Sequence, residues 1–270
     1  MEILNHMDYR KYSQLSDFLA FVGMYEDRRR MEAYRSLMEE YGDAIRDGVV
    51  VEAGAGFGIF SEYALELGAR RVYVVERNRY MLRILRRKFR GNRRVKVVPA
   101  DMMDFAPDEE VDVLIHDFYG PLLYDESLYV LDRLKFKPRI VLPDGGRLVM
   151  KVVPFDEILD EVVNRDVVEQ LEGVLVADLF DYDSSTDFPH EILRWRWGES
   201  LRGEGYCFDR DMGEHMLIFA LELWHGNKFL CRAGDCVNWS LVFTPVAGRE
   251  FRFKFRWGGD FMKVYFRWTD

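Results

Sequence analysis

Residues 49–60 read Val-Val-Val-Glu-Ala-Gly-Ala-Gly-Phe-Gly-Ile-Phe, and this stretch decides the fold. A run of β-branched residues leads into an acid and alternating glycines, and a helical pattern begins at Phe60. This order predicts a buried parallel strand, a tight turn and a helix. Gly54, Gly56 and Gly58 have no Cβ, so the turn can adopt positive φ and a ligand can lie against bare backbone. The pattern predicts a cofactor site, and an ordinary strand-to-helix loop is the alternative that a glycine-rich turn leaves open.

The next predicted strand supports the cofactor interpretation. Residues 71–75 read Arg-Val-Tyr-Val-Val, and Glu76 follows them directly. An acid at the end of a second parallel strand can accept hydrogen bonds from both hydroxyls of a ribose. A nicotinamide dinucleotide site would space its glycines as G-x-G-x-x-G, whereas here they occur at every second residue. The spacing argues against a dehydrogenase.

Glu52-Ala-Gly-Ala-Gly-Phe-Gly followed by Val75-Glu76 resembles the class I S-adenosylmethionine (SAM) methyltransferases. The resemblance implies SAM as cofactor, with Glu52, the three glycines and Glu76 lining its site. In class I enzymes an acid just beyond the third strand commonly accepts from the adenine amino group. The third strand is predicted at residues 95–99, so the resemblance implies this role for Asp101, with Asp104 as the second choice.

A helix ahead of the glycine stretch narrows the resemblance to the protein arginine methyltransferases. That family carries M-x-x-D-x-x-R-x-x-x-Y-R-x-x-M, and the chain matches it at Met24, Asp27, Arg30, Tyr34, Arg35 and Met38. By periodicity alone the apolar members would simply be core. In the family the first arginine holds the carboxylate of SAM and the methionine packs beside its sulfonium. The resemblance implies these roles for Arg30 and Met24.

The loop after the fourth predicted strand carries the most specific match. Residues 116–127 read His-Asp-Phe-Tyr-Gly-Pro-Leu-Leu-Tyr-Asp-Glu-Ser, which is similar to the family's double-acid loop, S-E-W-M-G-Y-x-L-x-Y-E-S. Asp117 and Glu126 stand at the two acid positions. Two carboxylates can grip a guanidinium through charge-assisted hydrogen bonds and aim one nitrogen at a methyl group. The resemblance implies that Asp117 and Glu126 are the catalytic residues.

Two departures leave the methyl acceptor open. Asp117 is one methylene shorter than the family's Glu, and Asn238 stands where the family has a proton-relaying His. Asn cannot accept that proton, and His116 or His225 are the candidates to replace it. The expected function is N-methylation of arginine in a protein or peptide. The alternatives are methylation of another amine, in a lysine, a small molecule or an RNA base, and a non-catalytic SAM-binding scaffold.

The fold class expected is α/β followed by β. Residues 1–46 are predicted to form N-terminal helices and a lid, with a break near Gly23. Residues 47–143 are predicted to form a Rossmann-like SAM-binding domain, and residues 144–270 an antiparallel, β-barrel-like substrate domain. The boundary lies at Lys137-Pro-Arg-Ile-Val-Leu-Pro-Asp144, which is similar to the family's K-P-D-G-x-x-x-P-D. Strict alternation in Phe-Arg-Phe-Lys-Phe-Arg-Trp (251–257) predicts a strand with one apolar and one basic face.

Residues 155–171 have apolar residues at helical spacing, at the place where relatives insert a helical arm. The resemblance implies a homodimer in which Ile158, Leu159, Val162 and Val163 contact the partner's nucleotide domain. The alternative is a helix that packs on its own β domain.

Composition limits the remaining classes. With 270 residues, 49% hydrophobic and 15% aromatic, the chain can bury a large core. Its N-terminus is polar and no window is apolar enough for a membrane span, so we expect a cytoplasmic protein without membrane contact. The five histidines and three cysteines show no metal-ligand spacing, so no metal and no disulfide framework are expected.

The net charge of −9 is unevenly distributed. Residues 70–96 hold twelve Arg or Lys against the single acid Glu76, a local charge of +11, so the rest of the chain carries −20. In residues 81–90 the basic residues Arg83, Arg86, Arg87, Lys88 and Arg90 interleave with apolar residues at helical spacing. A solvated helix face is the simplest interpretation, and docking of RNA or an acidic protein is the alternative.

Overall fold

In the computed structural model the chain is described over residues 8–178, 187–210, 212–235, 239–258 and 262–269. It divides into two compact units. The first unit comprises residues 1–117 and 133–143, and the second comprises residues 118–132 and 144–270. Among the described residues, no helix combines the length and the apolar character that crossing a bilayer requires.

The helices of the first unit are α1 (Tyr9–Glu26), α2 (Arg28–Glu40), α3 (Gly42–Ile45), α4 (Ile59–Glu66) and α5 (Arg79–Lys88). The break between the first two lies at Asp27, not near Gly23 as predicted. Asp27 has an extended backbone and its side chain accepts a hydrogen bond from the Arg30 N–H at 3.1 Å. An Asp in this position starts a new helix because it satisfies one of the otherwise unpaired amides of the first turn.

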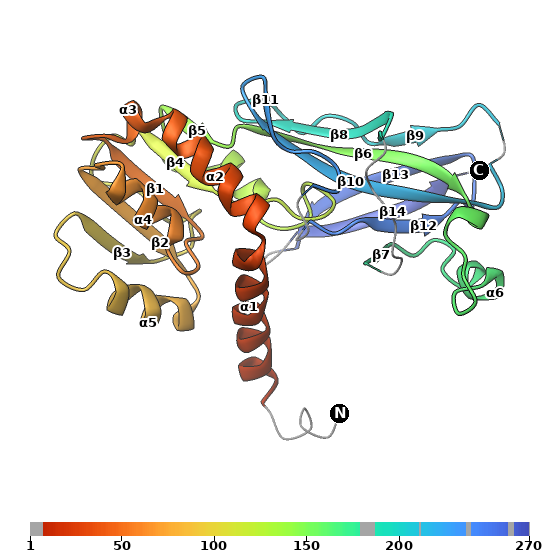
Figure 1. Ribbon diagram of the computed structural model, residues 1–270, viewed down its shortest axis with the longest axis horizontal. Helices are drawn as coiled ribbons and strands as arrows, with labels where there is room; N and C mark the ends of the chain where they lie inside the picture. The colour runs from red at the N-terminus through yellow and green to blue at the C-terminus, as the bar shows by residue number, and fades with distance from the viewer. Residues whose placement is uncertain (1–7, 179–186, 211, 236–238, 259–261, 270) are drawn as a thin grey trace. The chain divides into compact units, whose positions relative to one another are not determined.

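A five-stranded parallel sheet forms the centre of the first unit. Its strands are β1 (Val49–Ala53), β2 (Arg71–Glu76), β3 (Val95–Pro99), β4 (Val113–His116) and β5 (Ile140–Leu142), in the order β3-β2-β1-β4-β5 (Figure 1). Every residue of β1 is buried, as its β-branched run predicts. The order changes direction between β1 and β4, and ligands of open parallel sheets bind outside the carboxyl ends of the strands at such a point.

The second unit contains two antiparallel sheets. Its strands are β6 (Gly145–Pro154), β7 (Val176–Ala177), β8 (His190–Arg196), β9 (Gly205–Cys207), β10 (His215–His225), β11 (Lys228–Cys231), β12 (Val242–Pro245), β13 (Glu250–Trp257) and β14 (Met262–Thr269). One sheet has the order β7-β12-β10-β6-β8 with β11 paired to β10, and the other the order β14-β13-β9. The predicted α/β then β organisation is therefore confirmed, while closure into a barrel stays a prediction.

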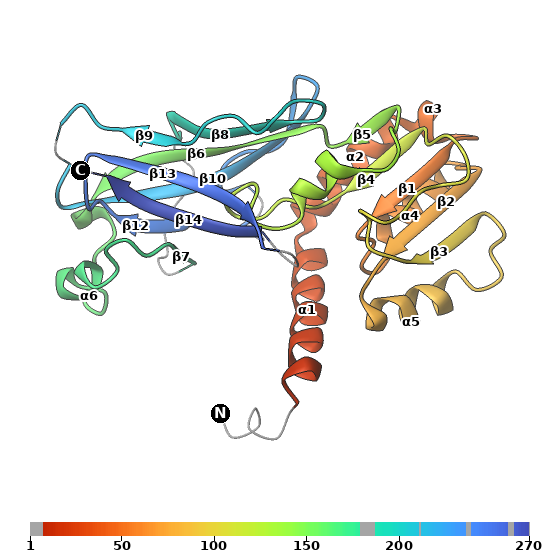
Figure 2. The ribbon, with the colours of Figure 1, turned by 180° about the vertical axis from the view of Figure 1, so that it is seen from behind.

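Aromatic side chains join the two sheets. Figure 2 shows both sheets of this unit, with β10 in one and with β13 and β14 in the other. Phe219 of β10 lies with its ring centroid 5.6 Å from that of Phe251 and 5.4 Å from that of Phe253, both on β13. Phe251 and Phe253 are buried, whereas Arg252 and Lys254, which alternate with them along β13, are exposed, which confirms the predicted alternation. Burial of each phenylalanine side chain contributes about 1.5–3 kcal/mol to the free energy of unfolding.

The predicted continuous helix over 155–171 is wrong. The segment forms a 3-10 turn, Phe155–Glu157, and a five-residue helix α6, Arg165–Glu169. Between them the Asp160 carboxylate accepts from the N–H groups of Val162 and Val163 at 2.7 and 2.6 Å. Such local side-chain bonds compete with the helix for backbone donors, and this competition interrupts the helical periodicity.

Candidate functional site

The register of the parallel sheet brings four loops to one edge. Ala53 at the end of β1 pairs with Val75 of β2 and with His116 of β4. Glu76 pairs with Pro99 at the end of β3. Parallel strands end at the same edge, so the segments that follow them lie together there. Four predicted site residues begin or sit beside these segments: Gly54, Glu76, Asp101 and Asp117.

Glu76 links two of these loops. It is buried, and its Oε2 accepts from the Gly56 N–H at 2.8 Å while Oε1 accepts from the Asn78 N–H at 2.6 Å. Burial raises the pKa of Glu76 above its ordinary value, against the lowering effect of these amide donors. A carboxylate has about four acceptor positions, so this one can hold both loops and still accept from ribose hydroxyls.

The three glycines all have positive φ, of 64°, 51° and 68°, as predicted. Gly54 is exposed, which suits close approach of a ligand. A Cβ on Gly56 would lie 2.8 Å from the Tyr25 hydroxyl and 2.9 Å from the Phe21 ring. A Cβ on Gly58 would lie 2.7 Å from Leu85 of α5. Gly56 is therefore required for contact with α1, and Gly58 for packing of α5.

Helix α1 covers the glycine loop. The Tyr25 hydroxyl donates to the Ala55 carbonyl at 3.3 Å, and the Tyr25 and Phe18 rings lie 5.3 and 5.5 Å from the Phe57 ring. Burial raises the pKa of Tyr25 well above its ordinary value, so this hydroxyl keeps its proton. Met24 is half-buried and directly precedes Tyr25 on α1, and its predicted contact with a cofactor stays a prediction. The contacts of Phe21 and Tyr25 were not predicted from the sequence, where both read only as apolar helix positions.

Glu52 points into the first unit. Its carboxylate accepts from the N–H groups of Phe60 at 3.3 Å and Ser61 at 2.9 Å, and from the Ser61 hydroxyl. These are the first amides of α4, so Glu52 caps that helix. Burial raises the pKa of Glu52 to about 7. The side chain therefore has a structural task here, and its predicted contact with a cofactor stays a prediction.

Asp117 is held by two residues of α2. Arg30 is buried, and its Nε lies 2.9 Å from Asp117 Oδ2 while its Nη2 lies 2.5 Å from Oδ1. The Tyr34 hydroxyl donates to Oδ1 at 3.0 Å, and its ring stacks on Phe60 with centroids 4.7 Å apart. A bidentate guanidinium pair fixes both the position and the plane of a carboxylate. The sequence motif contained Tyr34 but did not indicate that it would donate to Asp117.

Asp101 begins the loop after β3. Its Oδ2 lies 3.0 Å from Arg77 Nη1, and its Oδ1 accepts from the Met103 N–H at 3.0 Å. Asp101 Oδ1 thus stabilises the loop after β3, and Oδ2 forms an ion pair with Arg77 of the loop after β2. This places Asp101 next to the segment that follows Glu76.

Glu126 belongs to the second unit and is exposed. The loop around it is compact, because Asp125 accepts from the Leu122 N–H at 3.0 Å and a Cβ on Gly120 would lie 2.7 Å from Glu126 Cγ. The Trp239 indole donates to the Tyr119 carbonyl at 3.2 Å and so attaches the loop to the rest of the second unit. Asp117 is in the first unit, so each acid is positioned by a different part of the fold.

The histidines considered as proton acceptors have defined environments. His116 is fully buried, with Nε2 2.9 Å from the Pro143 carbonyl, and burial lowers its pKa to about 4. A group with that pKa is a weak base at neutral pH, so His116 does not fit the role. His225 lies in the second unit, with Nδ1 3.7 Å from Asp144 Oδ1. Asn238 lies outside the described residues.

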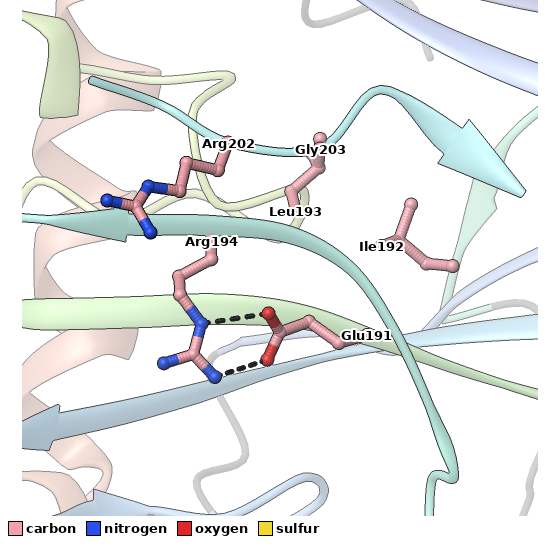
Figure 3. Close-up of a pocket in the computed structure, with 6 residues that line it drawn as sticks. All are labelled: Glu191, Ile192, Leu193, Arg194, Arg202 and Gly203. Carbon is pink, nitrogen blue, oxygen red and sulfur yellow. Dashed lines mark hydrogen bonds and ion pairs between the residues drawn. The ribbon is translucent and has the colours of Figure 1, made fainter. Parts of the chain in front are cut away.

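A surface pocket lies at β8 of the second unit (Figure 3). Arg194 and Glu191 form a bidentate pair across it, with Nε–Oε1 and Nη2–Oε2 distances of 2.8 and 2.5 Å. Leu193, Arg202 and Gly203 also line it, and none of the predicted site residues does. Glu191 and Arg194 satisfy each other, and Arg202 pairs with Glu199 at 2.8 Å, so we assign this pocket no ligand.

Among the residues that the structure describes, no cluster of three His, Cys, Asp or Glu side chains is arranged to hold a metal ion. Cys207 carries an exposed free thiol.

The sheet order, the positive-φ glycine loop after β1 and the acids after β2 and β4 define the class I methyltransferase fold. Comparison with known proteins agrees. The family model described as "Ribosomal RNA adenine dimethylase" matches residues 43–145. A crystal structure of PRMT6 with SAH superposes with a TM-score of 0.66 at 13% identity, covering 91% of this chain and 98% of that one. The Trypanosoma brucei PRMT1 enzyme-prozyme heterotetrameric complex with AdoHcy gives a TM-score of 0.61 at 16% identity, covering 92% of each chain.

Sequence relatives specify the resemblance further: the chain is similar to protein arginine methyltransferases. It is 36% identical over 164 residues to "Protein arginine N-methyltransferase PRMT10" of Oryza sativa subsp. japonica, covering 58% of this chain and 43% of the relative. It is 32% identical over 155 residues to "Probable histone-arginine methyltransferase 1.3" of Arabidopsis thaliana, covering 54% and 29%. The chain thus matches less than half the length of these relatives.

Proposed function

We propose that the protein is a SAM-dependent N-methyltransferase of the protein arginine methyltransferase type. The observation that carries the proposal is the placement of Asp117. This acid leaves β4 beside the glycine loop of β1, and Arg30 and Tyr34 hold its carboxylate there. A buried, oriented carboxylate at this edge of the sheet is suited to bind a cationic group next to a cofactor.

The residues of the first unit fit SAM. Glu76 would accept from the ribose hydroxyls, Asp101 would face the adenine amino group, and Gly54 offers exposed backbone. Arg30 would bind the cofactor's carboxylate, and Met24 on α1 would lie beside its sulfonium. When bound, SAM supplies an electrophilic methyl group.

The two acids would prepare the acceptor. A guanidinium is a poor nucleophile because its lone pairs are delocalised into the cation. Asp117 and Glu126 would draw the positive charge toward one side and direct a terminal nitrogen toward the methyl carbon. Most of the rate enhancement then comes from positioning. Because Arg30 contacts Asp117 directly, the same ion pair would connect the cofactor's carboxylate with the substrate acid.

The experiment that tests this proposal is incubation with methyl-labelled SAM and an arginine-containing peptide pool. Label should appear in peptide, and the matched pool with arginine replaced by lysine should stay unlabelled. Asp117→Glu restores the family's side-chain length, so it should preserve or raise the rate for arginine. A lower rate in Asp117→Glu, together with label on another amine, would overturn arginine as the acceptor.

Methylation of an RNA base is the second candidate, because the family model over residues 43–145 is that of ribosomal RNA adenine dimethylases. The same assay with an RNA pool decides between the two. Label in RNA and not in peptide would support the second candidate. SAM binding without transfer to peptide, amine or RNA would mean a non-catalytic scaffold.

A further inference from the structure

Helix α5 presents a row of arginines to solvent. Met81, Leu82 and Leu85 are buried against the first unit. The opposite face, its margin at Lys88 and the loop that follows carry exposed basic side chains, at Arg79, Arg83, Arg86, Arg87, Lys88, Arg90, Arg93 and Arg94. We call these eight residues the α5 basic face. On one helix face, residues three or four apart are neighbours, so each turn adds a cation beside the previous one.

The charges at the centre of this face are not compensated. At its margins Lys88 pairs with Glu62 at 2.6 Å, and the Arg94 guanidinium donates to the Ala69 carbonyl at 3.2 Å. Within the described part of the chain, Arg86, Arg87 and Arg90 form no ion pair. Like charges at i,i+4 destabilise a helix by about 0.2–0.5 kcal/mol per pair. A helix face that is only exposed to solvent typically carries positive and negative charges in alternation. The uncompensated positive charge of the α5 basic face instead favours binding of an anionic ligand.

An aromatic ring lies within the same face. The Arg79 and Arg83 guanidinium carbons lie 5.2 and 5.7 Å from the centroid of the Tyr80 ring. Tyr80 is half-buried, so part of its ring remains accessible. Arginine combined with aromatic rings stacks on nucleobases as well as binding phosphate, and this combination is typical of single-strand binding. An acidic peptide would use the charges and not the ring.

We infer that the α5 basic face binds single-stranded nucleic acid, with guanidinium groups on the phosphates and a base stacked at Tyr80. This binding goes beyond the proposed methyl transfer, and neither requires the other. Arginine predominates over lysine in the face, which favours the bidentate geometry of a phosphate. The sugar is not specified by these contacts, so RNA and DNA are both admitted.

The test measures the affinity of labelled oligouridylate and oligodeoxythymidylate at several salt concentrations. Binding should weaken with salt, with a logarithmic slope near −0.7 for each phosphate contact, as is typical of single strands. The variant Arg83→Gln/Arg86→Gln/Arg87→Gln/Arg90→Gln should lose about ten-fold or more in affinity at low salt, and its slope should be shallower by roughly 3. Tyr80→Ala should weaken nucleic-acid binding by about five-fold or more through lost stacking.

A matched control removes four positive charges from the exposed face of β13 and β14, as Lys254→Gln/Arg256→Gln/Lys263→Gln/Arg267→Gln. This control should bind like the wild type, and all variants should keep their unfolding midpoint. Equal losses in control and α5 variants would overturn the proposal, because binding would then reflect charge alone. Equal affinity for polyglutamate or for anionic phosphatidylserine vesicles, unaffected by Tyr80→Ala, would also overturn it. A difference between the two oligonucleotides would identify the sugar preferred.

Discussion

At the scale of single residues, Asp117 and Glu126 carry the proposed chemistry. Asp117→Asn and Glu126→Gln each remove one negative charge. Each also replaces a carboxylate, which only accepts hydrogen bonds, with an amide whose NH₂ group would donate toward the cationic substrate. We expect turnover to fall by about a hundred-fold or more in each, as for loss of a group acting in the transition state. SAM affinity should stay within about three-fold in Glu126→Gln. Single-turnover kinetics and calorimetry measure the two effects, and full activity in Glu126→Gln would remove this loop from the catalytic site.

Glu76 has a structural task besides the ribose contact that we propose for it. Glu76→Ala should weaken SAM binding strongly, and it should also lower stability, since the Gly56 and Asn78 amides lose their acceptor. Each buried unpaired amide costs about 1–3 kcal/mol. Glu76→Gln retains an acceptor oxygen and separates the effects. It should lose SAM affinity while unfolding nearer the wild-type midpoint, and unchanged affinity by calorimetry would contradict the ribose assignment.

The buried carboxyl of Glu52 predicts a pH dependence of stability. Burial raises its pKa from 4.5 to about 7, so between these values the folded state binds more protons than the unfolded state. The stability that this group contributes is present below pH 4.5 and is lost as the pH rises through about 7, by at most about 3 kcal/mol. Glu52→Gln is uncharged at every pH. Denaturant unfolding should therefore show this variant gaining stability relative to the wild type between about pH 5 and pH 8, and a constant difference would contradict the shift.

At the scale of elements, the start of α2 determines where Arg30 and Tyr34 point. Asp27 caps this helix. Asp27→Ala should cost about 1 kcal/mol of unfolding free energy, and Asp27→Asn, which can also cap, should cost less. Because the capped turn contains Arg30, the alanine variant should also reduce turnover more than the asparagine variant does. Chemical denaturation and steady-state kinetics test both statements, and equal behaviour of the two variants would count against the cap.

The segment between β6 and β7 packs differently from the helical arm that the sequence predicted. Ile158, Leu159 and Val163 are partly buried against a core cluster of their own unit that includes Val153, Phe155 and Phe243. Val162 remains 80% exposed. Of the four residues predicted at the dimer contact, three therefore pack on their own β domain, as the alternative interpretation expects. Val162 is the one that remains available for contact with another subunit.

At the scale of the whole molecule, a homodimer remains our prediction. The apolar side chains Val162 and Val167 are exposed on this segment, at 80% and 42%. In a dimer with two-fold symmetry the same surface of each subunit forms the interface, so these apolar side chains would be buried in both subunits. Light scattering should report a dimer, and Val162→Asp/Val167→Asp should shift it to monomer without changing the unfolding midpoint of the units. A wild-type monomer that persists at high concentration would contradict the prediction.

Much of the first unit and of the candidate site was determined by the sequence itself. The buried run of β1, the positive-φ glycines and the acid that follows β2 depend on local patterns, because strand burial and turn geometry are properties of adjacent residues. The same locality explains the prediction of β13 from strict alternation. Motif spacing then placed Asp117 and Arg30 on elements that the structure confirms, although it did not show that they touch.

Contacts between distant segments were decided only by the tertiary structure. Arg30 and Asp117 are 87 residues apart, and their ion pair exists because α2 packs against the carboxyl end of β4. The pKa of His116 is lowered because the fold buries it beside Pro143, and no feature of its sequence neighbours indicates that burial. Desolvation and long-range pairing are properties of the packed chain, so local sequence alone does not determine them.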